Sequence, residues 1–392
     1  MSVFSRETKL VVEQLDVDGI TKNQWTVPIL DGWGFSQAMN SSEVTINEME
    51  SGGISKRGKK VFNDSLAPAE WNFSTYMRPF LSTALGDWGS EKQHSVEECL
   101  WANFIANNRW DLIEQNWYSY NSTTTSYDST GSVVYNGTTD VEYNFSKSNV
   151  AELGKFNLYF ILGGCDTADI TGATVYKIED AVVNSTGIDF DIEGIATLNW
   201  TGFGRLISEV QVASNYFANT NEEAGLATSN FIRNRISGLQ LVAADTDAFP
   251  GASNDGVYNI ILTGGSISFE NNISYLTPDT LCAVNQPLGH VAGTRNISGS
   301  FTAYLDPAAG STAQLFKDLA EDLGGVTNSF DLTFNIGGLG SPSVAINCPQ
   351  AHLEVPVHSV EDLISIEVAF SGLATDMNST DEATITYKGV SV

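Results

Sequence analysis

The sequence predicts a mainly β protein made of two tandem copies of one domain. Three observations predict this fold: a globular composition, segments in which apolar residues alternate, and short motifs that recur in the same order in both halves. The chain has 392 residues, 42% hydrophobic and 10% aromatic, which is enough for two domains with cores of their own. We expect each copy to be a β-sandwich or half-barrel with one packed helix.

Four pairs of segments carry the repeat. LDGWGFSQAMN at 30–40 matches LTGGSISFENN at 262–272, and NFSTYMRP at 72–79 matches SFTAYLDP at 300–307. FNLYFILGG at 156–164 matches FDLTFNIGG at 330–338, and ATLNWTG matches ISIEVAFSG when Gly202 is laid on Gly372. The matches occur in the same order in both halves, so they are collinear. The offset in residue number drops sharply between the second and third pairs, which indicates an insertion in the first copy.

The matched segments have the chemistry of strands. Residues 156–162 and 330–336 alternate with a period of two, which predicts one buried and one opposite face. Paired glycines follow both runs, where the chain must leave the strand. Each copy should therefore contribute several antiparallel strands that pack one face on a core.

One helix is expected in each copy, after the proline that closes the second matched segment. The residues SVEE at 95–98 predict a capping box and a helix start, and in the second copy Ser311 can cap. The apolar stripes that we expect to face the core are Val96, Cys99, Leu100 and Phe104 in the first copy and Leu315, Phe316 and Leu319 in the second.

These features divide the chain into a first copy at 1–205, a linker at 206–230 and a second copy at 231–392. The linker is assigned from the polar run ANTNEEAGLATSN. The insertion in the first copy falls mainly at 109–152, a stretch rich in Ser, Thr, Gly and Tyr. This composition predicts a hairpin or a long surface loop on the outer side rather than a domain.

The charge of the chain argues against binding to polyanions. It has 47 acidic and 19 basic residues and a formal charge of −28, which disfavours contact with nucleic acid or anionic lipid. The opening stretch MSVFSRETKLVVEQLDVD contains charges where a secretory signal needs an apolar stretch, and no run is long enough for a membrane span. Four scattered cysteines, Cys99, Cys165, Cys282 and Cys348, predict free thiols in a reducing cytoplasm.

The sequence contains no catalytic motif, so we predict no enzyme, no catalytic residue, no cofactor and no metal. G-x-S-x-G, H-E-x-x-H and the phosphate-binding G-x-x-x-x-G-K are all missing. Cys348, His352 and His358 could be imagined as zinc ligands, but Pro356 interrupts the strand between the two histidines. Core or surface packing is the favoured interpretation of these three side chains.

An acidic stripe is predicted at Asp189, Asp191 and Glu193. With Gly194 they resemble the start of an EF-hand loop, but Trp200 occupies the position of the twelfth-residue ligand. Strand-like alternation puts the three carboxylates on one face, exposed to bulk solvent or to a wide aqueous lumen. A glycosidase-like carboxylate pair is the less favoured alternative.

One basic cluster stands out in the acidic chain. It consists of Lys56, Arg57, Lys59 and Lys60, and the second copy has no counterpart. Two interpretations have equal weight: a solvated loop, or a docking element that binds the acidic surface of another subunit or ring.

The segments that carry the repeat also carry a family resemblance. Residues 31–48 and 56–80, with LTGGSISFENNISYLTP, GSFTAYLDP and INCPQAHLEVPVHSVEDLISIEVAFSG of the second copy, resemble major tail tube proteins of siphophages, the phages with long non-contractile tails. The resemblance spans nearly the whole chain apart from 109–152 and the linker. It is strongest to the subgroup in which one chain fuses two tube domains.

The resemblance implies a structural virion protein of the phage tail, assembled in the host cytoplasm without membrane insertion. Chains of this kind would form homotrimeric, pseudo-hexameric rings that stack into a hollow tube conducting DNA into the host. The tape measure protein and genomic DNA would pass through the lumen without specific binding, and tail terminator and distal tail proteins would bind the ends. The alternative is a secreted β-sandwich carbohydrate-binding or adhesin module, against which the missing signal and the absence of paired cysteines argue.

Overall fold

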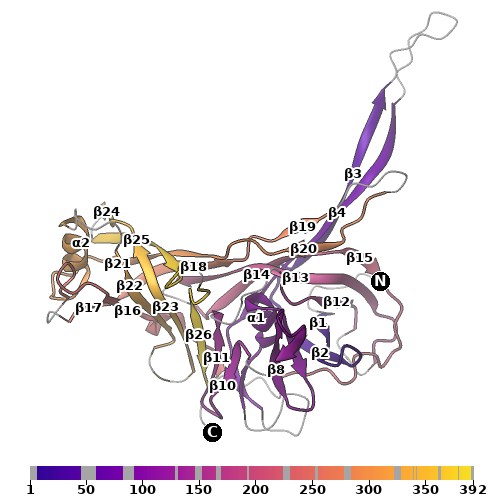
Figure 1. Ribbon diagram of the computed structural model, residues 1–392, viewed down its shortest axis with the longest axis horizontal. Coiled ribbons are helices and arrows are strands. Elements are labelled where there is room, and N and C mark those ends of the chain that lie inside the picture. Colours follow the sequence, from indigo (N-terminus) through magenta and orange to yellow (C-terminus); the bar gives the residue numbers. More distant parts are fainter. Residues whose placement is uncertain are drawn as a thin grey trace, which may run out of the picture.

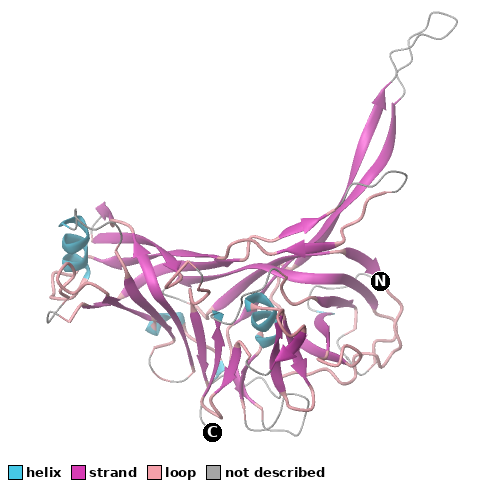
Figure 2. Ribbon diagram, in the orientation of Figure 1, coloured by secondary structure: helices cyan, strands magenta, loops and turns pink. Residues whose placement is uncertain are grey.

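The computed structural model is mainly β, as predicted (Figures 1 and 2). It describes residues 7–45, 59–82, 92–128, 131–145, 152–164, 169–191, 194–223, 230–251, 255–277, 284–321, 328–338, 340, 342–360, 363–377 and 379–389. Within these residues the strands form one 19-stranded sheet, a three-stranded sheet and two two-stranded sheets. No helix in the described part is long and apolar enough to cross a bilayer.

In the first half, two parts of the sheet share one long strand, β13 (Thr174–Asp191). The carboxyl-terminal part of β13 pairs with β14, which continues to β4 and β3. The amino-terminal part pairs with β12, which continues to β1 and β2, and β15 lies at its other edge. All of these pairs are antiparallel, and the bounds of the strands are β1 Thr8–Leu15, β2 Lys22–Val27, β3 Gly34–Thr45, β4 Lys59–Tyr76, β12 Phe156–Leu162, β14 Thr197–Gly204 and β15 Leu206–Glu209.

The second half repeats this pairing strand by strand. The order β18-β21-β25-β23 corresponds to β3-β4-β14-β13, and β22-β16-β17 corresponds to β12-β1-β2. β26 corresponds to β15, and β24 lies beside β25 after β23 ends. The bounds are β16 Gly238–Ala243, β17 Val257–Ile260, β18 Leu262–Glu270, β21 Asn296–Tyr304, β22 Phe330–Ile336, β23 Ser343–Leu353, β24 Val357–Val360, β25 Ile364–Leu373 and β26 Thr384–Lys388.

The register of the strands agrees with three of the four sequence matches. Gly34 lies opposite Asn72, and their counterparts in the first two matches, Ser266 and Ser300, also lie opposite each other. The strands β12 and β22 carry a bulge at the same place, between Phe156 and Leu158 in one half and at the equivalent position in the other. Shared irregularities of this kind are far more specific than alternation of apolar residues.

The fourth match is corrected by the structure. Trp71 lies opposite Gly202, whereas its counterpart Gly299 lies opposite Phe370. Gly202 therefore corresponds to Phe370 and not to Gly372. The sequence match was therefore shifted by two residues. Because side chains of a strand alternate between its faces, a shift of two residues assigns each side chain to the correct face.

The corrected register shows an exchange between the two halves. At one cross-strand position the first half has an aromatic ring on β4 and glycine on β14, while the second half has glycine on β21 and an aromatic ring on β25. A Cβ added at Gly202 would lie 2.2 Å from the ring of Trp71, and one at Gly299 would lie 2.8 Å from the ring of Phe370. In both halves the ring occupies the space that the missing side chain leaves.

Gly202→Ala should lower the free energy of unfolding by about 2–3 kcal/mol, because overpacking forces the ring and the backbone apart. The added Cβ would also lie 2.1 Å from the carbonyl oxygen of Val182. Gly187→Ala is the matched control on the neighbouring strand, where the nearest atom to a new Cβ is 3.7 Å away. Urea unfolding of the unassembled chain measures both changes, and equal losses would contradict this account.

Two pairs of strands join the two halves. β13 pairs with β18 from Ser185 opposite Glu270 to Asp191 opposite Gly264. In addition, β11 (Asp140–Asn144) pairs with β26 near the end of the chain. Most buried apolar side chains of both halves form one contiguous cluster, so the fold is one packed unit with internal repetition.

The helices occupy equivalent places in the order of elements but differ in burial. All eight residues of α1 (Glu98–Ile105) are buried, whereas α2 (Thr312–Glu321) buries one side only, with Leu315 and Leu319 inward and Phe316 half-buried. A short 3₁₀ helix spans Asn234–Ile236. The predicted capping box is wrong, because Ser95 belongs to a strand and its hydroxyl bonds to that of Tyr143 at 2.7 Å. Glu97 precedes α1 without a side-chain cap.

The insertion covers α1, which explains the difference in burial. The expected hairpin is present, but the insertion is not a surface loop, because its strands carry the fully buried Trp110, Trp117 and Val141. The strands β7-β8-β9 form the three-stranded sheet, and β10 pairs with β11 as a hairpin. The bounds are β7 Asn108–Asp111, β8 Asn116–Asn121, β9 Ser126–Asp128 and β10 Val133–Tyr135, and the two small sheets are β5 Pro79–Leu81 with β6 Gln93–Ser95 and β19 Ser274–Leu276 with β20 Gly289–Val291.

The segment expected as a linker packs on the first half as far as it is described. Phe217 is fully buried, and Asn221 forms a bridge with Trp25 of β2. Arg78 and Glu223 form an ion pair at 2.8 Å with both side chains less than 5% exposed. Residues 206–223 are therefore part of the folded body.

Candidate functional site

The strands β3-β4-β14-β13-β18-β21-β25-β24 form one continuous curved sheet through both halves (Figure 1). One face of this sheet packs on the core, and the side chains of the other face are exposed or half-exposed. We call the second face the polar face. Small polar residues dominate it: Ser36, Asn72, Ser74, Asn199, Thr201, Ser185, Ser266, Ser268, Asn296, Ser298, Ser300, Thr302 and Ser371.

The charged residues of the polar face are acidic where β4, β14, β13, β18, β21 and β25 lie side by side. The described ones are Glu70, Asp189, Glu270 and Glu367. Lys60 continues the same side of β4 along the projecting part of the β3–β4 hairpin. Asp189 of the predicted acidic stripe is exposed there and accepts a hydrogen bond from Asn199 at 3.3 Å. The side chains of Asp191 and Glu193 lie outside the described residues. A surface of this composition can donate hydrogen bonds from its hydroxyl groups to the phosphates of DNA. It offers no cation that could replace the counterions of the DNA.

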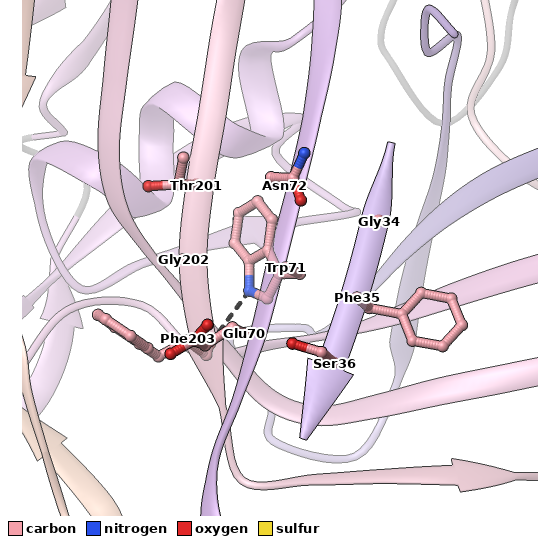
Figure 3. A pocket seen from close by; sticks show the side chains of 9 residues that line it. All are labelled: Gly34, Phe35, Ser36, Glu70, Trp71, Asn72, Thr201, Gly202 and Phe203. Atoms are coloured by element: carbon pink, nitrogen blue, oxygen red, sulfur yellow. Dashed lines mark hydrogen bonds between the residues drawn. The ribbon is translucent and has the colours of Figure 1, made fainter. Parts of the chain in front are cut away.

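A hollow of roughly 570 Å³ opens beside β3 and is lined by strands β3, β4 and β14 (Figure 3). The Trp71 indole N–H donates to the carbonyl oxygen of Phe203 at 3.1 Å, and its ring is 2% exposed. Glu70 is the one carboxylate among the lining residues, so the hollow does not supply the carboxylate pair that a glycosidase needs. Its lining is Gly34, Phe35, Ser36, Glu70, Trp71, Asn72, Thr201, Gly202 and Phe203.

Two edges of the continuous sheet have no partner strand within the described part of the chain. β3 pairs only with β4, and β24 pairs only with β25. The counterparts of these edges, on β18 and β13, pair with each other. Unpaired N–H and C=O groups at an edge are ready to pair with another chain.

The β3–β4 hairpin projects from the body as an arm (Figure 1). The first six residues of β4 are all exposed, and among them are Val61 and Phe62, 55% and 56% exposed. Lys59 forms an ion pair with Glu43 across the hairpin at 2.9 Å, and Lys60 is exposed beside it. Lys56 and Arg57 lie outside the described residues. A two-stranded ribbon with exposed apolar side chains needs a partner to be stable.

A buried polar cluster, which the sequence did not predict, ties α1 to the last strand. The hydroxyl of Tyr387 in β26 donates to the Glu97 carboxylate and accepts from the Trp101 indole N–H at 3.0 Å. Glu98 accepts from the Trp117 indole N–H at 2.7 Å and lies 2.8 Å from Nδ1 of His94. The sequence signal was two adjacent carboxylates at the start of an apolar helix, which only a buried network can satisfy.

The contribution of Glu97 to the stability of the chain should fall as the pH rises from about 5 to 9. Burial raises the pKa of Glu97 from 4.5 to about 8, so between these values the folded chain holds a proton that the unfolded chain has lost. Glu97→Gln keeps an acceptor for Tyr387 and removes the ionisation. It should flatten the pH dependence and gain about 2–4 kcal/mol at pH 9. Urea unfolding at pH 5, 7 and 9 measures this, with exposed Glu367→Gln as the control. A Glu97→Gln variant whose stability changes with pH as that of the wild type does would contradict it.

The side chains considered as zinc ligands do not gather. Cys348 is fully buried in β23, and burial raises the pKa of its thiol to about 12. His352 is half-buried on the same strand, and His358 is exposed on β24 with its ring 4.3 Å from that of Phe316. Across the described ranges, no three metal-ligating side chains form a group.

Comparison with known proteins shows what the chain is similar to. No protein-family model matches the chain. The chain is similar to tail tube protein pb6 of Escherichia phage T5, with 27% identity over 383 residues. The match covers 96% of this chain and 74% of that protein. It therefore spans both halves of the chain.

Proposed function

We propose, on the premise that this chain is a homologue of siphophage tail tube proteins, that it polymerises as stacked trimeric rings into a hollow tube that conducts DNA. The chain is a structural protein of the phage tail. The observation that carries the proposal is the continuous sheet, which has a polar face on one side and one unpaired edge at each end. The two repeated halves are the two tube domains of each chain.

Ring closure follows from the two edges. One edge belongs to the first half and the other to the second, so pairing them between chains is head-to-tail. A head-to-tail interface that closes on itself produces a ring and leaves no edge exposed. Because the two halves repeat the same strand order, a ring of three chains has six similar units around its axis.

The polar face suits the inside of a DNA channel. DNA must slide along the wall, and a wall that bound phosphate would hold it. Small hydroxyl and amide side chains, with the four carboxylates described on this face, provide a hydrated, repulsive lining. The tape measure protein and genomic DNA would pass along this face, and terminator and distal tail proteins would bind the two ends of the tube.

The arm is proposed to bridge adjacent rings. Its exposed Val61 and Phe62 supply apolar contact, and the lysines at its far end supply charge complementary to an acidic neighbour. Of the two interpretations of the basic cluster, this one is favoured because β4 begins with Lys59 and Lys60 and belongs to the hairpin that projects from the body (Figure 1).

Lys59→Glu combined with Lys60→Glu should shorten the tubes and make their assembly more sensitive to salt. Each surface pair contributes only about 0–1 kcal/mol, so the effect depends on repetition along the tube. Electron microscopy of tubes assembled at low and at high salt gives their length. Lys317→Glu with Glu321→Lys on α2 is a charge-neutral control. Tubes of unchanged length would favour the other interpretation, in which the basic cluster is a solvated loop.

The direct test of the proposed function is negative-stain microscopy of the purified or virion-derived protein, with mass photometry of any rings. We expect hollow filaments and a ring mass of three chains. A chain that stays monomeric under all assembly conditions, or rings of another size, would overturn the corresponding part of the proposal.

A further inference from the structure

We propose that neighbouring chains pair in the same register as β13 and β18 do inside one chain. In this register β24 of one chain pairs with β3 of the next, with Val357 opposite Ser36 and Ser359 opposite Gly34. The proposal rests on the ring of the proposed function and names the contact that closes it. It follows from the repetition of the two halves. Within one chain the first half pairs with the second half, and in a ring the second half of each chain must pair in the same way with the first half of the next chain.

The internal join supplies the template. β13 and β18 pair antiparallel, with Gly187 opposite Ser268 and Asp189 opposite Ser266. Between these pairs Ile188 lies opposite Ile267, and both side chains are at most 1% exposed. Every residue pair of this join is therefore fixed by the alternation of a polar face and a core face.

β24 is the counterpart of the part of β13 that makes this join. Gly187 lies opposite Asn199 of β14, and Val357 lies opposite Glu367 of β25. Val357 is the counterpart of Gly187, because the same correspondence of residue numbers holds along the rest of these strands. β24 thus continues β23 past the break at Pro356, in the position that β13 occupies without a break.

β3 is the counterpart of β18, the other partner in the template. Gly34 lies opposite Asn72 of β4, and Ser266 lies opposite Ser300 of β21. Asn72 and Ser300 are counterparts in the repeat, so Gly34 corresponds to Ser266 and every other position of β3 follows from this pair.

Transferring the template by these correspondences gives the register between chains. Val357 comes to lie opposite Ser36, and the next positions along the two strands, His358 with Phe35 and Ser359 with Gly34, follow in antiparallel order. Both strands have free edges in the described chain, so the pairing displaces no existing partner.

The side chains fit this register. Val357 is 70% exposed in the single chain, which is unusual for a strand valine and expected for one awaiting a partner. Glycine and serine on β3 leave room on the polar face, and no pair places like charges opposite each other. On the core face, His358 and Phe35 replace the two isoleucines of the internal join, so the contact between chains is more polar than the internal one.

The proposed contact between chains consists of one pair of strands, whereas the two halves within a chain are joined by two pairs of strands. Inside the chain, β11 of the insertion pairs with β26 and strengthens the join. β15, the counterpart of β26, pairs only with β13 among the described residues. Rings should therefore dissociate into intact chains before the halves of one chain separate.

Paired cysteines test the register directly. Opposite residues of antiparallel strands have Cβ atoms about 4.5–5.5 Å apart, whereas diagonal neighbours are about 7–8 Å apart, too far for a disulfide. Ser36→Cys with Val357→Cys, and separately Gly34→Cys with Ser359→Cys, should form covalent dimers and trimers on mild oxidation of assembled tubes. Ser36→Cys with Ser359→Cys, one pair off register, should form roughly tenfold less, and each single variant is a background control.

The outcomes separate this proposal from the function on which it rests. Tubes that cross-link best at the off-register pair, or at neither on-register pair, overturn the register while the tube function stands. A wild-type chain that forms no rings overturns the function first. If the variants fail to assemble, hydrogen exchange of the wild-type chain decides: amides of Val357–Ser359 should exchange at least about tenfold more slowly in tubes than in unassembled chain. Equal exchange overturns the register as well.

Discussion

Val61→Asp combined with Phe62→Asp should abolish tubes while leaving the chain folded. Both side chains are more than half exposed on the arm, so aspartate there costs the single chain little. In the proposed tube the same side chains are buried against the next ring, where two unpaired carboxylates per arm would cost several kcal/mol, about 2–5 for each contact. Because every ring presents the arm of every chain, assembly should fail completely rather than weaken.

Microscopy and sedimentation measure the loss of tubes, and circular dichroism with urea unfolding confirms that the chain is folded. Ile113→Asp is the matched control, since this side chain is 90% exposed in the insertion, outside the arm. It should assemble like the wild type. Tubes of normal length from the double variant would show that the arm does not bridge rings.

Reversing the charge of the polar face should convert an inert channel into one that holds DNA. Glu70→Lys, Glu270→Lys and Glu367→Lys replace three of the four carboxylates of this face with cations, and each new cation can release counterions from a phosphate. Tubes should still form, because these side chains do not contribute to the core. DNA retention in the variant tubes should rise by at least about tenfold at low salt and fall steeply as salt increases.

Binding of short duplex DNA to assembled tubes, measured between about 50 and 200 mM salt, checks this result. A variant with the same change in charge at three exposed positions off the polar face, Glu114→Lys, Glu152→Lys and Glu321→Lys, is the control. If this control variant retains as much DNA as the first, the polar face does not line the channel.

Much of the fold could be predicted from the sequence. The alternation in 156–162 and 330–336 predicted strands because a sheet with one buried face requires a period of two. Collinear matches predicted the repeat, and three of them agree with the observed register. The one error, at Gly202, arose because glycine was assumed to match glycine. In the structure an aromatic ring and a glycine exchange strands, which only the cross-strand contact reveals.

The sequence was least informative about the insertion and the polar cluster. Composition predicted a hairpin or a long surface loop at 109–152, and a hairpin is present as β10 and β11. The burial of Trp110 and Trp117 was not predicted, and it arises because the segment covers α1 and pairs with the end of the chain. The spacing of Ser95 and Glu98 predicted a helix cap, but the hydroxyl of Ser95 forms a hydrogen bond with that of Tyr143 in the insertion. Contacts between residues far apart in sequence carry no local signal.

By itself, the sequence determined the mainly β class, the tandem repetition and the acidity, because periodicity, self-similarity and charge are properties of the chain. Only the tertiary structure decided that Asp189 shares a face with Glu70 and Glu367, and that the arm lifts Lys59 away from the body. It also decided that β3 and β24 keep free edges in the described chain while their counterparts pair. The reason is that an edge or a face exists only once strands from distant segments have been placed side by side.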